Sequence, residues 1–547
     1  GVKQAGEMER LVRNHPSVIM DTYINEPFAP DKYELGYRHM SRRELELFFD
    51  ACDAAVYYEN PDRVVKRVEG DYDPPTGKGL SDFHCYNMWY TNHAIPLGML
   101  YKGYLPALKK GWKTGCGEYG TEGLDNYDVM RKYYPPEWLP EKDSDYWIPD
   151  RIVKSQSNTM HGDWYEEQDN IRDWIEKSQE HQEFATRLMT LAFRRRSDMI
   201  VSTAVHLLID AWPSGWMKTL VDVDRVPKRA YFAFRESLEP LKINLRCDRW
   251  TAYEGEELEI EAWILNDTSN VFSGLTAFAT MRNAKGDFMN YFLDIKNITP
   301  CTGIPVGIIK ASVPKPHDAG PIYIDACLGS EDECISSERL AIKVYKKPAD
   351  SIKVCGIGGN ACRIISKTPG LEETQPENSE AVIISSRTQY EAMVNTIPEK
   401  KKKLFIIPEE NEKFYVVDGI KWKYTPVFDP DEKGENCVLK GLSFAAVSKK
   451  IQHIFPGDSM SYWYNEEKGC IDHVAEYYIE GEDMEALAFG FEKPAFGKIT
   501  QGRKRRLAFA GISGANRFLS LETKGRSGMN PVLDEFIKFL MTEPAQK

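Results

Sequence analysis

The sequence predicts a multidomain chain: an α/β part is followed by a β-sandwich and then by a second α/β part with a doubly wound parallel sheet. Three observations predict this order. Helical and strand-like apolar patterns alternate in residues 1–243, period-two alternation dominates residues 244–348, and strands alternate with helices again in residues 349–547. A chain of 547 residues leaves room for two to four domains of about 150 residues each.

In the first part, residues 42–54 and 181–196 have the apolar spacing of amphipathic helices. We interpret residues 82–87 as a strand end and residues 199–212 as a helix end, a turn and a buried strand. Residues 133–168 are rich in Trp, Tyr, Pro and acidic side chains. This stretch is too long for an ordinary connection, so we expect an active-site loop insertion.

In the middle part, residues 258–265, 274–281 and 322–327 alternate apolar and polar side chains, with turn residues between them. This pattern predicts the strands of the sandwich. In the last part, residues 352–356, 381–386 and 404–408 are short apolar strands, and residues 389–395 have helical spacing. This alternation predicts the doubly wound sheet.

Composition and charge exclude several classes of function. The formal net charge is -13, which disfavours nucleic acid and anionic membranes as partners because both attract basic surfaces. No run of about 18 apolar residues indicates a membrane span, and the first residues lack the apolar core of a signal peptide. We therefore expect a cytoplasmic protein. The chain opens with Gly1, which suggests a processed or truncated product.

The 11 cysteines are scattered and odd in number, and none form a CxxC pair, although Cys327 and Cys334 are near neighbours. This usage predicts reduced, buried thiols. The 10 histidines do not cluster with the cysteines at ligand spacing. We expect no metal site and no cofactor.

Two glutamates carry the main functional signal. Glu26 ends the segment 14–26 (NHPSVIMDTYINE), and Glu118 lies in segment 114–123 (TGCGEYGTEG). We interpret each as the end of a buried parallel strand that is followed by a turn. Retaining glycoside hydrolysis requires two carboxylates at such strand ends, one to protonate the leaving oxygen and one to attack the anomeric carbon.

Three segments resemble glycoside hydrolase family 2. Residues 11–26 resemble its acid/base signature, and residues 117–120 (GEYG) look like its nucleophile strand. Residues 210–231 are similar to the last barrel strand and helix of its galactosidase, mannosidase and glucosaminidase members. The resemblance covers roughly residues 1–345. It implies the C-terminal portion of a (β/α)8 TIM barrel over residues 1–243 and an Ig-like β-sandwich over residues 244–348.

The resemblance also implies roles for individual residues. Glu26 would be the general acid/base, Glu118 the nucleophile, and Asn25 would bond the sugar 2-hydroxyl. The sixth barrel strand would bring His84, Tyr86 or Tyr90 near the nucleophile, and which of them does so stays open. The further substrate-binding candidates are Trp89 on the same strand and Trp212 or Trp216, which would stack on the sugar. Glu122 is the rival nucleophile, four residues after Glu118.

Residues 349–547 resemble the glutamine-amidotransferase-like, flavodoxin-type domain appended to some sugar hydrolases. No Gly-x-Cys-x-Gly elbow follows the third strand, where residues 408–411 (PEEN) stand instead. We therefore expect a non-catalytic domain. The glycine-rich stretch 356–360 (GIGGN) lacks the full dinucleotide fingerprint, so we interpret it as a tight turn.

The chain departs from the family at its front, because the first three barrel units would precede residue 1. A barrel sheet cannot close on five strands without exposed edges. We therefore expect the N-terminal half as a separate subunit, a bound fragment or an omitted segment, and we expect this chain alone to be inactive.

The resulting prediction is a retaining exo-β-glycosidase, β-galactosidase-like, that takes a carbohydrate substrate. Two alternatives stay open: a non-catalytic carbohydrate-binding or scaffold subunit, and a β-glucuronidase or other glycosidase specificity. Homo-oligomer formation also stays open.

Overall fold

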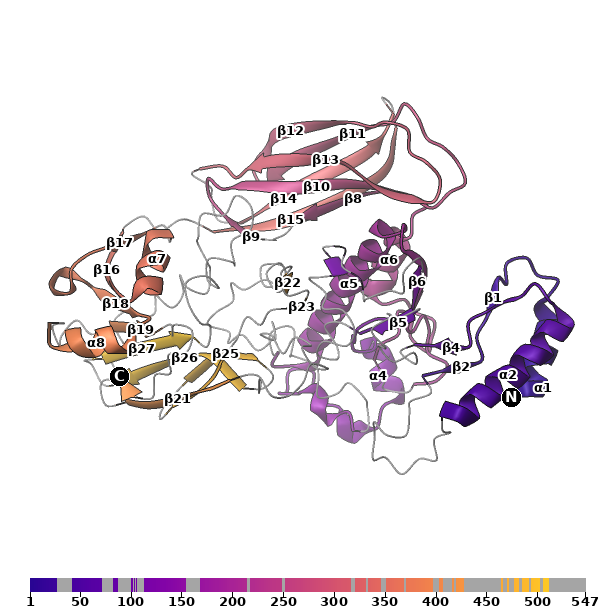
Figure 1. Cartoon of the computed structure of the whole chain (residues 1–547), viewed down its shortest axis with the longest axis horizontal. Coiled ribbons are helices and arrows are strands. Elements are labelled where there is room, and N and C mark those ends of the chain that lie inside the picture. Colours follow the sequence, from indigo (N-terminus) through magenta and orange to yellow (C-terminus); the bar gives the residue numbers. More distant parts are fainter. Residues whose placement is uncertain are drawn as a thin grey trace. The chain divides into compact units, whose positions relative to one another are not determined.

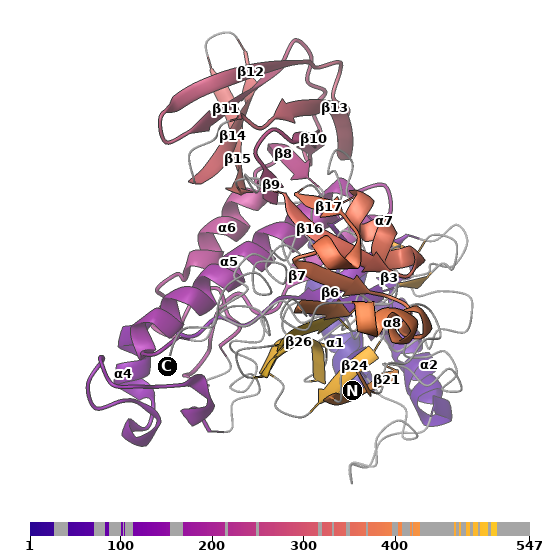
Figure 2. The ribbon, with the colours of Figure 1, turned by 90° about the vertical axis from the view of Figure 1, so that its left-hand side faces the viewer.

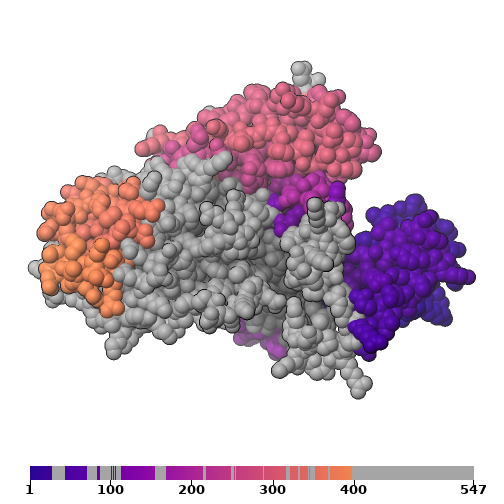
Figure 3. Space-filling view, in the orientation of Figure 1, coloured from indigo at the N-terminus to yellow at the C-terminus, as the bar shows by residue number. Residues whose placement is uncertain are grey.

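The computed structural model of the chain describes residues 1–26, 42–70, 82–86, 100–101, 103, 105, 113–153, 168–213, 217–247, 251–315, 320–330, 333–345, 351–367 and 370–396. Beyond residue 396 it describes the backbone of the strands named below; residues of uncertain placement are grey in Figure 3. The chain mixes helices and strands and divides into two compact units. Unit 1 comprises Gly1–Tyr86, Leu105–Tyr119 and Asp198–His206; unit 2 comprises Asn87–Tyr104, Gly120–Ser197 and Leu207–Lys547.

Unit 1 combines two helices with short parallel strand pairs and one parallel sheet. Strand β1 pairs with β3, β2 pairs with β4, and the third sheet has the order β5-β6-β7. The elements are α1 (Val2–Val12), β1 (Met20–Asp21), β2 (Ile24–Asn25), α2 (Arg42–Glu59), β3 (Val64–Val65), β4 (Val68–Glu69), β5 (Asp82–Cys85), β6 (Thr114–Tyr119) and β7 (Ile200–Val205).

A buried ion pair ties the first helix of unit 1 to the turn after the second. The carboxylate of Glu9 on α1 accepts hydrogen bonds from Arg63 Nε at 2.8 Å and from Asn60 Nδ2 at 2.8 Å. Arg63 also donates to the carbonyl of Val18, just before β1. Helices α1 and α2 lie side by side (Figure 1), with Gly6 against Ala55. Removing either charge would leave the other buried without its main partner, which is destabilising.

Two predicted strands of unit 1 are less buried than expected. The strand before Glu26 was predicted to be buried, yet it consists of two short segments, and Ile19 and Met20 beside the first are exposed. In β7, predicted buried, Ile200 is buried but the next four residues are exposed. Beside β2, Leu45, Phe49 and Val68 form a small buried cluster, against which Tyr23, Ile24 and Phe48 pack.

The first part of unit 2 is helical. It contains α4 (Tyr127–Tyr133), the 3₁₀ turns η2 (Pro136–Trp138) and η3 (Pro149–Arg151), α5 (Ile171–Arg195) and α6 (Arg229–Ser237). Helix α5 begins ten residues before the predicted start, where Asn170 Oδ1 accepts from the backbone N–H groups of Arg172 and Asp173, each at 3.1 Å. Helices α5 and α6 pack together, as Figure 2 shows.

The stretch predicted as a loop insertion has a core of its own over its described residues. Trp147 is completely buried, and its indole N–H donates to the carbonyl of Trp138 at 2.7 Å. The core around it consists of Leu124, Met130, Tyr134, Leu139, Trp147, Ile152, Ile171, Trp174 and Met217. Of the described aromatic residues in this stretch, Tyr134 and Trp147 belong to the core and Trp138 packs against it, whereas Tyr133 and Tyr146 are exposed.

The middle of the chain forms two sheets over one shared core. One sheet has the order β13-β10-β8 and the other β12-β11-β14-β15-β9. The strands are β8 (Leu241–Cys247), β9 (Thr251–Tyr253), β10 (Glu257–Asn266), β11 (Thr276–Asn283), β12 (Gly286–Asp294), β13 (Thr302–Ser312), β14 (Gly320–Gly329) and β15 (Cys334–Tyr345). Alternate residues of β10 and β11 are buried, which confirms the period-two reading of these segments.

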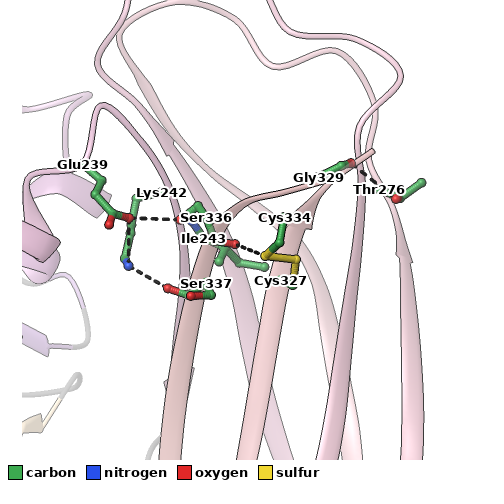
Figure 4. The surroundings of a disulfide bond; sticks show 9 residues. All are labelled: Glu239, Lys242, Ile243, Thr276, Cys327, Gly329, Cys334, Ser336 and Ser337. Atoms are coloured by element: carbon green, nitrogen blue, oxygen red, sulfur yellow. Dashed lines mark hydrogen bonds and ion pairs between the residues drawn. A yellow bond between two sulfur atoms is a disulfide. The ribbon is translucent and has the colours of Figure 1, made fainter. Parts of the chain in front are cut away.

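A disulfide joins Cys327 of β14 to Cys334 of β15 (Figure 4). The expectation of reduced thiols is wrong for this pair, because antiparallel pairing places the two α-carbons 5.8 Å apart. Beside it, the hydroxyl of Ser336 accepts from the backbone N–H of Ile243 at 3.2 Å. The disulfide therefore lies near a hydrogen-bonded contact between the two sheets.

The last sheet begins with five parallel strands in the order β17-β16-β18-β19-β27, to which β26 and β25 add antiparallel. Counted along the chain, the parallel strands run 2-1-3-4-5, an order found in doubly wound sheets. Its elements are β16 (Ile352–Ile357), α7 (Gly359–Lys367), β17 (Leu371–Glu373), η5 (Pro376–Asn378), β18 (Ala381–Ile384), α8 (Arg387–Met393), η6 (Val394–Thr396), β19 (Lys403–Ile406), β25 (Glu485–Gly490), β26 (Lys493–Gln501) and β27 (Arg505–Ala510).

Smaller sheets complete the described backbone. They contain β20 (Val416–Val417), β21 (Ile420–Pro426), β22 (Tyr464–Asn465), β23 (Cys470–Ile471) and β24 (Tyr477–Gly481). Residues 531–541, whose apolar spacing predicts an amphipathic helix, lie outside the described residues. Within the described residues, the helices are all too short or too polar to span a bilayer.

Unit 2 buries a group of charges beside α6. Lys228 Nζ donates to the carbonyl of Gly123 at 2.7 Å and lies 3.9 Å from Asp125 Oδ1. The nearby Asp210 accepts from the hydroxyl of Thr219 at 2.8 Å. Burial, reinforced by the charge of Asp125, raises the pKa of Asp210 to about 6.

We predict that Asp210 makes unit 2 less stable as the pH rises from about 4 to about 6. Its pKa is higher in the folded than in the unfolded state, so the folded state binds its proton more tightly and loses that advantage on ionisation. Asp210→Asn should remove this loss, on the order of 2 kcal/mol. Urea unfolding followed by tryptophan fluorescence at several pH values measures it. Asp224→Asn, on an exposed partner of Lys132, is the control. A pH-independent difference between Asp210→Asn and the parent protein would contradict the prediction.

We also predict that replacing both Cys327 and Cys334 by Ser lowers the free energy of unfolding by about 2 kcal/mol, because the disulfide closes a short loop. Urea unfolding without reductant measures the loss, and peptide mass mapping of the unreduced protein should show the linked pair. Cys301→Ser, at an exposed free cysteine, should change little. Detection of two free thiols at 327 and 334 would show the disulfide assignment to be wrong.

Candidate active site

Glu26 stands at the end of β2 in an unusual backbone conformation. Strand β2 pairs in parallel with β4, and the backbone N–H of Glu26 donates to the carbonyl of Glu69 at 3.0 Å. The φ angle of Glu26 is 46°, in the left-handed region that non-glycine residues rarely adopt. Such a conformation costs on the order of 1 kcal/mol and persists where the surrounding contacts hold it.

Glu118 is turned by a bulge in β6. In the pairing with β5, Phe83 lies opposite Cys116 and His84 lies opposite Glu118, so Gly117 is the extra residue. The pairing of β6 with β7 also shifts register after Cys116. A bulge redirects the side chain that follows it, and here that side chain is the carboxylate of Glu118.

The ends of β2, β5 and β6 bring three side chains together. His84 Nδ1 lies 2.5 Å from Glu26 Oε1 and 3.6 Å from Glu118 Oε2. One carboxylate oxygen of Glu26 and one of Glu118 lie within 4.8 Å of each other. The hydroxyl of Tyr86, just after β5, donates to Glu118 Oε2. His84 is completely buried, whereas both carboxylates are partly exposed, so small molecules can reach them.

The neighbours give the two carboxylates different chemistry. The hydroxyl of Tyr86 donates a hydrogen bond to Glu118 and orients its carboxyl group. The short contact between His84 and Glu26 is a hydrogen bond in which either group can carry the proton. Glu26 therefore has a partner with which it can exchange a proton, whereas Glu118 has a hydroxyl donor that orients it.

Three residues beside this cluster were not singled out by the sequence analysis. Glu69 ends β4 and Gly70 follows it; a Cβ on Gly70 would lie 2.6 Å from His84 Cε1 and 3.1 Å from Glu26 Cγ. His206, just after β7, has Nε2 3.9 Å from Glu118 Oε2 and its ring edge-on to Tyr86. The sequence could have indicated these residues only by their location, because each stands at or just after the end of a parallel strand.

Glu26, His84 and Glu118 also offer the donors of a cation site. One nitrogen and two carboxylate oxygens suit Zn²⁺ or similar ions, and no other such group appears in the described part of the chain. Two ligands of one Zn²⁺ ion lie roughly 3 Å or more apart. The 2.5 Å contact between His84 and Glu26 is shorter, so this pair has the geometry of a shared proton.

The other predicted site residues lie elsewhere or outside the described residues. Asn25 is exposed at the end of β2, next to Glu26. Trp212 belongs to unit 2 and is 67% exposed. The rival Glu122 lies beyond the end of β6, is completely buried and accepts a hydrogen bond from Thr121. Trp89, Tyr90 and Trp216 fall outside the described residues.

Comparison with protein-family models gives no match, and comparison with curated proteins gives none. Among solved structures, a β-D-mannosidase from Dictyoglomus thermophilum aligns at 14% identity and a TM-score of 0.46, over 65% of this chain and 42% of its own. Bacteroides uniformis β-glucuronidase 2 aligns at 15% identity and 0.29, over 64% and 37%. A glycoside hydrolase family 2 β-glucuronidase aligns at 13% and 0.29, over 64% and 29%. These structural neighbours are β-glycosidases, and the chain spans less than half the length of each.

We predict that Gly70→Ala destabilises unit 1 by about 2–3 kcal/mol, because the new methyl group meets His84 and because φ is +80°. Gly274→Ala is the matched control: its φ is +73° but nothing lies within 4 Å, so only the backbone cost of about 1 kcal/mol is expected. Urea unfolding measures both. Equal losses in the two variants would show that Gly70 is not in contact with His84.

Proposed function

We propose that this chain carries the catalytic pair of a retaining exo-β-glycosidase. The observation that carries the proposal is the approach of Glu26 and Glu118, whose nearest carboxylate oxygens are within 4.8 Å. Retaining glycosidases hold their two carboxyl groups about 5–5.5 Å apart, whereas inverting enzymes need a wider gap for a water molecule.

In the first step, ionised Glu118 attacks the anomeric carbon while Glu26 gives its proton to the departing glycosidic oxygen. The products are a glycosyl ester on Glu118 and a free alcohol. In the second step, Glu26 takes a proton from water, and the resulting hydroxide attacks the anomeric carbon and releases Glu118. The hydroxyl of Tyr86 holds Glu118 in its attacking orientation, and His84 holds Glu26 and shares its proton.

The remaining substrate contacts are part of the proposal. Asn25 would bond the sugar 2-hydroxyl, as the family resemblance implies, and its exposed side chain beside Glu26 supports this role. The stacking of Trp212 on a sugar ring rests on the sequence resemblance. The roles of Trp89, Tyr90 and Trp216, and the β-galactosidase-like specificity, rest on the sequence resemblance.

The domain assignments belong to the same proposal. Unit 1 would contribute strands to a (β/α)8 barrel, the two packed sheets would be an Ig-like sandwich, and the 2-1-3-4-5 sheet would be a non-catalytic flavodoxin-like domain. An N-terminal half, from another chain or segment, would supply the first barrel strands. The exposed Met20, Val64 and Val201 on β1, β3 and β7 support this, because barrel strands are covered on both faces. We also propose a cytoplasmic location for the protein.

The test uses activated 2-deoxy-2-fluoro aryl β-glycosides of galactose, glucuronic acid, mannose and glucose with the protein as assembled in its source. One of them should add one glycosyl unit, and peptide mapping should place it on Glu118. Glu118→Gln should abolish labelling and lower turnover of the matching aryl glycoside by at least about 1,000-fold. Glu122→Gln should still be labelled at Glu118. A label on Glu122, or full turnover by Glu118→Gln, would disprove the assignment.

A further inference from the structure

A third carboxylate stands beside the two in the proposed active site. In the parallel pairing of β2 with β4, Glu69 lies opposite Asn25. The carbonyl of Glu69 accepts from the backbone N–H of Glu26. Glu69 therefore ends the neighbouring strand at the same level as the proposed acid/base.

The side chain of Glu69 reaches from β4 to the bulge of β6. A Cβ built on Gly117 would lie only 1.6 Å from Glu69 Oε1, so the carboxylate fills the space that the glycine leaves open. Gly117 is the extra residue of the bulge and immediately precedes Glu118. The missing side chain at position 117 is thus what allows a carboxylate to stand next to the proposed nucleophile.

Lys66 holds this carboxylate from its other oxygen. Lys66 Nζ donates to Glu69 Oε2 at 2.6 Å, and both side chains remain partly exposed, at 18% for Lys66 and 26% for Glu69. The lysine offsets the charge of a third acid near Glu26 and Glu118. It also fixes the direction of the carboxylate, which reduces the entropy lost when a further partner binds.

We propose that Glu69 is a sugar-binding carboxylate, which accepts a hydrogen bond from one hydroxyl of the substrate while Glu26 and Glu118 act on its anomeric carbon. This subsite rests on the proposed glycosidase function. A carboxylate acceptor forms a charge-assisted bond with a hydroxyl, so its loss should reduce kcat/KM about 10- to 100-fold. The ligand class is a glycoside with a free hydroxyl at the position that faces β4.

The test compares the best aryl β-glycoside with its monodeoxy analogues, each lacking one hydroxyl. For one analogue, the unmodified enzyme should lose about 10- to 100-fold in kcat/KM. Glu69→Ala should show the same loss on the parent glycoside and almost no further loss on that analogue. Gly117→Ala keeps Glu69 but displaces its carboxylate, because the flexible end of that side chain must move away from the new methyl group. This variant should therefore show the same loss as Glu69→Ala on the parent glycoside and almost no further loss on that analogue. Glu69→Gln, which keeps the shape without the charge, should fall between.

Glu7→Gln is the control, because Glu7 also pairs with a lysine, Lys3, but on the exposed surface of α1. It should leave all rates unchanged. Equal losses on every analogue, or rates within twofold of the unmodified enzyme, would overturn the sugar contact while leaving the glycosidase function intact. An unmodified protein that neither turns over an aryl glycoside nor labels at Glu118 would overturn both. Unfolding midpoints of Glu69→Ala, Glu69→Gln and Gly117→Ala show whether the compared proteins are folded.

Discussion

The arrangement of the candidate site depends on the imidazole of His84. The two glutamates stand on different sheets of unit 1, and His84 Nδ1 contacts a carboxylate oxygen of each. The ring is completely buried, so its polar atoms require partners in the protein. Its Nδ1 lies 2.5 Å from a carboxylate oxygen of Glu26 and 3.6 Å from one of Glu118, so this nitrogen stands between the two carboxylates. Chemistry at one anomeric carbon requires this closeness.

Two glycines make room for this polar cluster. Gly70 lets His84 and Glu26 approach the end of β4, and Gly117 lets Glu69 approach the bulge of β6. Side chains at either position would occupy space that the cluster now fills. The site therefore depends on the two glycines as well as on the charged residues. Gly70 directly follows Glu69, and Gly117 directly precedes Glu118.

The buried charges of unit 2 have a structural role. Asp125, Asp210 and Lys228 are buried among backbone carbonyls and hydroxyls, and Arg195 donates to Asn244 Oδ1 of β8 at 2.6 Å, which connects α5 to the first strand of the two-sheet part. These groups hold elements of the fold together, and the ionisation of Asp210 changes the stability of the fold. A pH profile of activity thus has to be separated from the pH dependence of stability.

The sequence by itself located helices α2, α5 and α8 and part of the strands, and it singled out Glu26 and Glu118 as candidates, because apolar periodicity and strand-end residues are local properties. Helix α5, the alternating strands β10 and β11, and the parallel strands β16 and β18 follow from that periodicity. The proximity of Glu26 and Glu118 was an expectation from strand ends and resemblance. Only the tertiary structure decided that Tyr86 contacts Glu118, that His84 contacts Glu26 and that Glu69 approaches Gly117. It also decided that Trp147 fills a core and that Cys327 meets Cys334. These contacts join residues distant along the chain or across a strand register, and local patterns do not encode such distances.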